Sequence, residues 1–393
     1  MSTQKVVDGM ITGTVSSSKL TGVLPALDGS ALTGIVGITK SSSDPTLTTN
    51  PATGTGTIWL NTVSGEMWCC TDATTDANVW TNVGLGTGGV QPIAYQGTTY
   101  GYAAGGAGPM PQGAYSKVIN KFSFTSATAD ATDGGDLQAN RGAGSGGSSA
   151  THGYVLAGWS PNPSPGYTAH TGIEKWAFAN DNGAASITGV VTVAVQYTSN
   201  GNTSASHIYK TGGYNNSGTN TNIIDRLDTA TDGNMTDVGD LTNSTSRQSS
   251  STSTTHGFSA GGLPFTNVIN KFSFAATSTV GDHGDLTYNP YGSAGNSSTT
   301  HGYTSGGQDT GDVTRLYVNR YSFSSNTTAS AMTATLAAGA VDNAATSDSE
   351  THGYQAACKS NNVITRFAFA TDSDSTDVGD LTNSVYAPMG TQF

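Results

Sequence analysis

The run Thr-His-Gly-Tyr lies at Thr151–Tyr154 and returns along the chain as an internal repeat. Its other copies, two of them eroded, lie at Thr99–Tyr102, Ser206–Tyr209, Thr255–Phe258, Thr300–Tyr303 and Thr351–Tyr354. Measured between histidine positions, with Tyr100 standing in the first copy, the successive spacings are 52, 55, 49, 45 and 51 residues. A period of about fifty residues is typical of a propeller blade.

Two more markers follow the copies in a fixed order. An aromatic strand motif, Val-Ile-Asn-Lys-Phe-Ser-Phe at 118–124 and 268–274, comes first, and a marker ending in Gly-Asp-Leu follows it. The first, fifth and seventh residues of the motif share one face at the two-residue period of a strand, so this strand has an apolar face to bury. One small sheet cannot bury both of its faces, whereas six sheets arranged radially cover one another. The sequence therefore predicts an all-β fold with a closed six-bladed β-propeller at residues 88–393.

The last part of the sequence predicts how the ring closes. After Leu381 the chain carries one more strand-like stretch and reaches Phe393 three residues before a seventh histidine position is due. We expect this stretch to pair with the first blade, near Tyr100. Residues 90–97 are an alternative for the same place, and the pattern leaves the choice open.

The connections between the Thr-His-Gly-Tyr run and the aromatic strand vary most in length. Variable loops on a regular scaffold are typical of a recognition surface, and we expect these loops to share one face of the ring. Aromatic rings that stack on a sugar or fill a partner's pocket contribute strongly to binding. The predicted binding residues in these loops are Trp159, Tyr167, Tyr214 and Phe265.

The composition argues against several classes of function. The net charge is −12, with 15 Lys and Arg and no basic cluster, so binding to nucleic acid or to an anionic membrane surface is disfavoured. No segment has the pattern of a signal peptide or the length of a membrane helix. Cys69, Cys70 and Cys358 form neither a disulfide framework nor a metal-binding pattern, so we interpret them as reduced packing residues. We predict no metal and no cofactor.

Residues 1–45 differ from the repeats. The tripeptide Leu-Thr-Gly occurs at 20–22 and again at 32–34. This segment is too short and too poor in apolar residues to form a core alone. We therefore predict that it is an attachment and oligomerisation segment, which becomes ordered against partner chains.

Residues 46–87 are predicted to form a small β domain. Strand-like stretches at 57–61 and 66–70 flank a turn, which is a hairpin pattern, and 79–83 supplies a third strand. Three of the five tryptophans of the chain lie here. We interpret them as a miniature core, because each buried indole removes about 150 to 250 Å² from water. A sugar-stacking surface is the alternative.

These motifs resemble two kinds of bacteriophage sequence. Residues 14–35 and 56–83 are similar to the N-terminal modules of tail-fibre proteins. The blade motifs resemble kelch-like propeller repeats in large structural proteins of marine and cyanobacterial phages. The resemblance implies a virion component, a tail fibre or other surface appendage, with an N-terminal segment that contacts other virion proteins and a distal kelch-like propeller. It also implies a trimer.

Five of the seven histidines share one repeat position: His152, His207, His256, His301 and His352. A role needed once in each blade explains them better than a single active site, so we interpret them as structural hydrogen-bonding residues. Metal ligation around the central channel and catalysis are the alternatives.

The repeated aspartates, such as Asp237 and Asp377, are interpreted as turn residues that bind backbone amides. Calcium binding by Asp372, Asp374 and Asp377 is the alternative, although they lack the spacing of a dedicated loop.

An enzymatic role is not predicted. Glycoside cleavage needs a carboxylate pair in a groove, and the three glutamates, Glu66, Glu174 and Glu350, stand in ordinary contexts. No serine elbow, phosphate loop or zinc pattern occurs. The predicted function is therefore a virion appendage that binds a host-surface glycan or receptor. A capsid or tail decoration protein that contacts only the virion is one alternative, and a glycan-cleaving tail spike is another.

Overall fold

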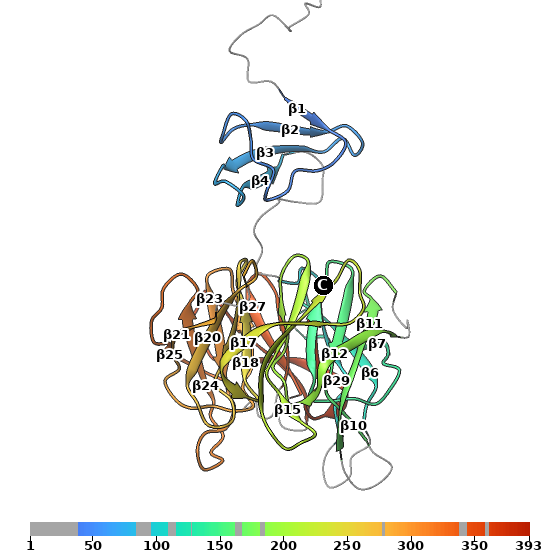
Figure 1. Cartoon of the computed structure of the whole chain (residues 1–393), viewed down its shortest axis with the longest axis vertical. Helices are drawn as coiled ribbons and strands as arrows, with labels where there is room; N and C mark the ends of the chain where they lie inside the picture. The colour runs from blue at the N-terminus through green and yellow to red at the C-terminus, as the bar shows by residue number, and fades with distance from the viewer. Residues whose placement is uncertain are drawn as a thin grey trace, which may run out of the picture. The chain divides into compact units, whose positions relative to one another are not determined.

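The computed structural model describes residues 38–83, 96–108, 115–126, 128–161, 167–180, 185–276, 280–337, 344–357 and 361–393. The regular structure within these ranges is β-strand, which confirms the all-β class (Figure 1). They contain no helix with the length and apolarity needed to cross a membrane. Contacts divide the chain into two units, residues 1–92 and 93–393.

The first unit is a small sheet with strand order β1-β2-β3-β4. Its strands are β1 (Thr39–Ser41), β2 (Ile58–Asn61), β3 (Met67–Asp72) and β4 (Val79–Asn82). The expected hairpin and third strand are confirmed, and β1, which the sequence pattern did not predict, pairs in parallel with β2. Trp68 and Trp80 are buried beside Cys70, and the rings of Trp59 and Trp80 meet edge to face at 5.8 Å. At least Trp68 and Trp80 therefore form a core.

The cysteines of this unit agree with a packing role. Cys70 is buried and reduced, and burial raises the pKa of its thiol. Cys69 is half-buried and also reduced. Cys358 and residues 1–37, which make up most of the predicted attachment segment, lie outside the described residues.

The described part of the second unit contains six antiparallel sheets, numbered here 1 to 6 in the order of their sequence repeats. Sheet 1 consists of β30 (Met389–Gln392), β5 (Tyr100–Ala104), β6 (Val118–Ser123) and β7 (Thr132–Asp136). Sheet 2 consists of β8 (Ser145–Ser148), β9 (His152–Leu156), β10 (Trp159–Pro161), β11 (Tyr167–Ala177), β12 (Ser186–Gln196) and β15 (Tyr214–Asn215). Sheet 3 consists of β13 (Asn202–Thr203), β14 (His207–Thr211), β16 (Thr221–Asp228) and β17 (Thr236–Thr245).

Sheets 4 to 6 each have four strands. Sheet 4 consists of β18 (Ser249–Thr252), β19 (His256–Ala260), β20 (Val268–Ser273) and β21 (Val280–Asp285). Sheet 5 consists of β22 (Ala294–Ser297), β23 (His301–Ser305), β24 (Tyr317–Ser322) and β25 (Ser330–Thr335). Sheet 6 consists of β26 (Ala345–Asp348), β27 (His352–Ala356), β28 (Asn361–Ala368) and β29 (Thr376–Val385).

Each sheet is a meander whose order follows the sequence markers. The Thr-His-Gly-Tyr run opens the second strand, the aromatic motif forms the third, and the Gly-Asp-Leu marker lies in or directly after the fourth. Sheet 1 takes its first strand from the other end of the unit, since Met389 of β30 pairs with Ala104 and Gln392 pairs with Gly101. Of the two candidates for this place, the C-terminal stretch therefore occupies it.

First strands of different sheets lie against one another. The contacting pairs are β8 with β13, β13 with β18, β18 with β22, β22 with β26, β26 with β30, and β30 with β8. Because the strands within a sheet are antiparallel, alternate connections lie at opposite ends. The end that holds the histidine turns is called the histidine face. The end that holds the connections between second and third strands is called the loop face, where β10 and β15 lie (Figure 1).

The glycine of the Thr-His-Gly-Tyr run lies beneath an aromatic ring of the next strand. Gly153 pairs across the strands with Trp176, and a Cβ on this glycine would overlap the indole. The same holds for Gly257 under Phe272. In sheet 3 both partners change together, because Ile208 replaces the glycine and Leu227 replaces the ring. The glycine therefore makes room for the cross-strand ring.

The tyrosine of the run joins neighbouring sheets. Tyr209 of sheet 3 lies on Phe274 of sheet 4 with ring centres 4.9 Å apart, and Tyr303 lies on Phe369 at 5.0 Å. Between sheets 2 and 3, where no ring follows, Tyr154 bonds to Asp232 at 3.3 Å. Packing between sheets explains why the run and the aromatic motif repeat together.

Candidate functional site

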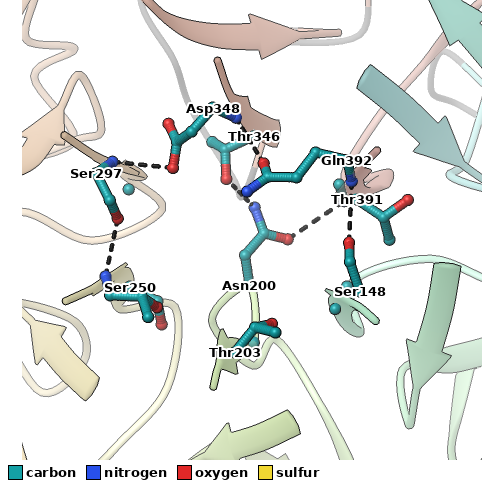
Figure 2. Close-up of a pocket in the computed structure, with 15 residues that line it drawn as sticks. Ser148, Asn200, Thr203, Ser250, Ser297, Thr346, Asp348, Thr391 and Gln392 are labelled. Atoms are coloured by element: carbon teal, nitrogen blue, oxygen red, sulfur yellow. Dashed lines mark hydrogen bonds between the residues drawn. The ribbon is translucent and has the colours of Figure 1, made fainter. Parts of the chain in front are cut away.

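The first strands of the six sheets surround a narrow polar cavity, called here the axial cavity (Figure 2). Its volume of about 40 Å³ is enough for a few water molecules or one ion. Equivalent positions of the six strands line it in two levels. The glycine ring consists of Gly146, Gly201, Ser250, Gly295, Thr346 and Gly390, and the polar ring consists of Ser148, Thr203, Thr252, Ser297, Asp348 and Gln392.

Close approach of the strands explains the glycine ring. A Cβ on Gly146 would overlap the backbone oxygen of Gly390 in the neighbouring first strand, and one on Gly295 would overlap that of Ser250. Side chains are therefore excluded at most positions of this level, although the sequence analysis did not single out these glycines.

A chain of hydrogen bonds explains the polar ring. The backbone N–H of Thr252 donates to Ser297 Oγ at 2.8 Å, and that of Ser297 donates to Asp348 Oδ2 at 2.9 Å. Continuing in the same direction, Asp348 N donates to Gln392 Oε1 at 2.5 Å, and Gln392 N donates to Ser148 Oγ at 3.0 Å. Four of the six residues thus supply an oxygen to the preceding sheet, which requires a polar side chain (Figure 2).

Asn200 crosses the axial cavity, and residues 96 and 97 lie at one end of it. Asn200 reaches from sheet 3 to Thr346 of sheet 6, where its Nδ2 donates to the hydroxyl, and its Oδ1 accepts from Gly390 N at 3.4 Å (Figure 2). At the histidine face, Gln96 Nε2 donates to Ser297 O at 3.0 Å, and Gly97 N donates to Asp348 O at 2.7 Å. The Asn200 side chain therefore bridges the cavity, and Gln96 and Gly97 bound it at the histidine face.

Asp348 is the ionisable group of the axial cavity. It is the single ionisable side chain among the described lining residues, and it is buried. Its Oδ1 accepts from Asn296 Nδ2 at 2.8 Å, in addition to the bond from Ser297. Burial raises the pKa of the carboxyl to about 7, against the opposing effect of these hydrogen bonds.

The five repeated histidines lie at the histidine turns and are not among the lining of the axial cavity. Each Nδ1 lies 2.7–2.8 Å from the hydroxyl of the preceding Thr or Ser. Within the turn, the His152 N–H donates to Ser149 Oγ at 3.1 Å, and this bond also repeats. Burial lowers the pKa of all five imidazoles, and the Lys or Arg of the adjacent third strand lowers it further. A structural hydrogen-bonding role at this position is confirmed.

The repeated aspartates accept backbone hydrogen bonds, but they do so inside strands. Asp237 Oδ1 accepts from Gly239 N at 3.1 Å, and Asp377 Oδ1 accepts from Gly379 N at the same distance. Both glycines have positive φ at an irregularity of the fourth strand. The expected amide-binding role is confirmed, and the expected turn is corrected to a bulge in a strand, next to which the two glycines adopt positive φ.

All three aspartates considered for calcium bind backbone amides, Asp377 within its own strand and the other two across sheets. Asp372 accepts from Thr333 N and Ala334 N at 2.9 and 2.7 Å, and Asp374 accepts from Thr335 N at 2.8 Å. They join sheet 6 to the outer strand of sheet 5. Among the described residues, no group of three His, Cys, Asp or Glu lies close enough to hold a metal ion.

The four predicted binding residues occupy different environments. Tyr214 and Phe265 are 36% and 42% exposed and lie in loop-face connections. Trp159 is only 2% exposed, because its ring packs edge to face on Tyr115 at 5.0 Å. Its expected exposure is therefore corrected, and the indole belongs to a small core. Tyr167 begins β11, and its side chain lies outside the described set.

The structure adds a cation and rings that the sequence pattern did not identify. The Arg247 guanidinium lies 4.0 Å from the ring centre of Tyr197 and 5.8 Å from that of Tyr291. The Tyr291 ring meets Phe265 edge to face at 5.6 Å. Arg247 and Tyr197 both have positive φ, and each N–H donates to the carbonyl of the equivalent residue in the preceding sheet. Only the fold brings these separated residues together at the loop face.

Two buried ion pairs stabilise the sheets. Arg141 contacts Glu174 at 3.0 Å, and Lys210 contacts Asp225 at 3.3 Å. Both carboxylates stand at the third-strand position that holds Asn270 in sheet 4, and both accept a hydrogen bond from the preceding sheet. Desolvation lowers the pKa of Lys210, and Asp225 opposes this shift. The contacts of Glu174 are therefore structural.

No protein-family model matches the chain, and no curated protein matches it significantly.

Proposed function

We propose that this chain is a structural protein of a bacteriophage virion, a tail fibre or similar appendage that binds a host-surface glycan without cleaving it. The virion part of the proposal is supported by the resemblance of residues 14–35, 56–83 and the blade motifs to phage structural proteins. The glycan part is supported by the loop face.

Within this proposal, residues 93–393 form a closed six-bladed kelch-like β-propeller. Its support is the junction of sheets 6 and 1, which repeats the contacts of consecutive sheets. Tyr354 lies on Phe124 with ring centres 4.7 Å apart, and its hydroxyl donates to Phe124 O at 3.2 Å. Removing residues 385–393 deletes β30 and should lower the melting temperature sharply. An unchanged melting temperature would contradict closure through this strand.

The observation that carries glycan binding is the pair of exposed rings at the loop face, Tyr214 and Phe265. Aromatic rings with one free face stack on the apolar faces of sugars, and a rigid sheet scaffold holds such loops in place. Gly97 bridges Ser349 at the histidine face, so the start of the described second unit lies at the end opposite these rings.

A double variant tests glycan binding. Tyr214→Ala with Phe265→Ala should weaken adsorption to host cells about tenfold or more, since two interface rings are removed. The melting temperature should change little, because both rings are more than a third exposed and the lost edge-to-face contact of Phe265 with Tyr291 costs about 1 kcal/mol. Phe393→Ala, which removes a 39% exposed ring at the histidine face, is the matched control.

The outcomes separate the candidate functions. Full adsorption by virions that carry the double variant would favour the decoration protein, whose loop face contacts only other virion subunits. Trp159→Ala does not serve as a binding variant. Removing its buried indole should cost about 3 to 5 kcal/mol of stability.

The proposed trimer depends on residues 1–45. If this segment assembles the protein, deleting residues 1–43 should convert a trimer to a monomer in light scattering. The same mass with and without the segment would contradict this role.

A further inference from the structure

The axial cavity contains one buried carboxyl group, that of Asp348, and no cationic side chain among its described lining residues. Asp348 is 7% exposed, and Asn296 Nδ2 and Ser297 N, which donate to its carboxylate, are both neutral. Burial of a carboxylate is unfavourable unless an opposite charge or a full set of donors compensates it. A cation in the adjoining cavity would supply that compensation.

Oxygen atoms from several sheets surround the same space. Ser148 and Ser297 each receive a backbone N–H, and each hydroxyl oxygen has a second lone pair. The Ser250 hydroxyl lines the cavity, is buried, and has no hydrogen-bond partner among the described residues. An unsatisfied buried hydroxyl indicates that the cavity holds something that the hydroxyl can bind.

We propose that the axial cavity binds one Ca²⁺ ion through the Asp348 carboxylate and neighbouring oxygen atoms of the lining. Calcium accepts carboxylate, carbonyl and other oxygen ligands in flexible geometry, whereas Mg²⁺ requires a near-ideal octahedron and retains its water. One carboxylate gives the site a low ligand charge. Its affinity therefore belongs to the weak class, with Kd of about 10⁻⁴ to 10⁻³ M.

Position in the fold gives this site a consequence beyond the proposed glycan binding. Asp348 belongs to sheet 6, its carboxylate is held by Asn296 and Ser297 of sheet 5, and its N–H contacts Gln392 of sheet 1. An ion bound there joins three sheets at the axis. A ligand that binds only the folded state raises its stability by mass action. Calcium therefore stabilises the second unit.

Asp348→Ser is the sharpest test, because serine already occupies the equivalent positions of sheets 2 and 5, at Ser148 and Ser297, and so is compatible with the fold there. Asp348→Asn is the second variant. Asp240→Asn is the matched control, since it removes one negative charge at an exposed position of β17. Equilibrium dialysis with radioactive Ca²⁺ measures the stoichiometry of binding. Thermal unfolding in 10 mM CaCl₂, in 10 mM MgCl₂, and in NaCl of the same ionic strength measures the stabilisation.

Wild-type protein should bind one Ca²⁺ per chain with a Kd of up to about 10⁻³ M, and of the three salts only CaCl₂ should raise its melting temperature. Both Asp348 variants should bind Ca²⁺ at least tenfold more weakly. The Asp240 control should behave as wild type. Absence of Ca²⁺ binding would overturn the proposal, leaving the cavity to water. Equal binding by folded Asp348→Ser protein, or an equal response to all three salts, would overturn it as well.

Discussion

Asn120 and Thr382 lie 262 positions apart in the chain, yet they form the two hydrogen bonds that join consecutive sheets elsewhere. Asn120 Oδ1 accepts from the N–H and hydroxyl of Thr382 at 2.9 and 2.7 Å. Asn270 accepts from the N–H and hydroxyl of Thr242 at 3.0 and 2.6 Å. The junction between sheets 6 and 1 thus has the chemistry of the junction between sheets 3 and 4.

This equivalence predicts the cost of two substitutions. Asn120→Ala and Asn270→Ala should each lower the free energy of unfolding by about 1 to 3 kcal/mol, because each removes a buried side-chain amide whose oxygen accepts two hydrogen bonds from the preceding sheet. Urea unfolding measures both. If Asn120→Ala cost nothing while Asn270→Ala cost this amount, sheets 6 and 1 would not be joined in solution.

Crowding of the first strands gives a second prediction. Gly146→Ala should destabilise strongly, by about 3 kcal/mol or more, because its Cβ would overlap the backbone of Gly390 and a strand must move. Gly281→Ala in β21 is the control, since nothing lies within 4 Å of a Cβ there. Comparable melting temperatures for the two variants would show that the first strands are not packed this tightly.

Exchange of a cross-strand pair gives a third prediction. Ile208→Gly in sheet 3 should destabilise by about 3 kcal/mol or more, because it deletes a buried side chain opposite Leu227. Adding Leu227→Phe should recover part of this loss, since a ring covers the glycine in sheets 2 and 4. A double-mutant cycle measures the coupling. Additive effects would show that the two changes in sheet 3 are unrelated.

The repeated histidines give a prediction for pH. Their folded pKa values lie below 6.5, so NMR titration of the five imidazoles should give midpoints below this value. Between the folded and unfolded pKa values, the unfolded chain binds more protons than the folded protein. Their contribution therefore makes the free energy of unfolding rise with pH through this interval and fall as pH drops below about 6.5.

A variant isolates this contribution. With all five histidines replaced by Gln, the difference in stability between pH 7 and pH 5 should shrink relative to wild type. Midpoints at or above 6.5 in the folded protein would reverse the sign and contradict the prediction.

Local pattern was enough to predict the strands of each repeat. Side chains alternate along a strand, so the aromatic motif showed its buried face. Regular recurrence of Thr-His-Gly-Tyr also showed that its histidines serve each repeat rather than one active site. These properties depend on neighbours within a few residues, and such neighbours are visible in the sequence.

The sequence by itself determined the all-β class, the number and order of the repeats, and the location of the variable loops. Only the tertiary structure decided that Trp159 is buried, that Arg247 lies between Tyr197 and Tyr291, and that Asp348 lines the axial cavity. These features arise where residues from different sheets meet. A strand pattern specifies which side of its own sheet a residue takes, whereas burial and charge at the axis depend on what the neighbouring sheets bring to the same point.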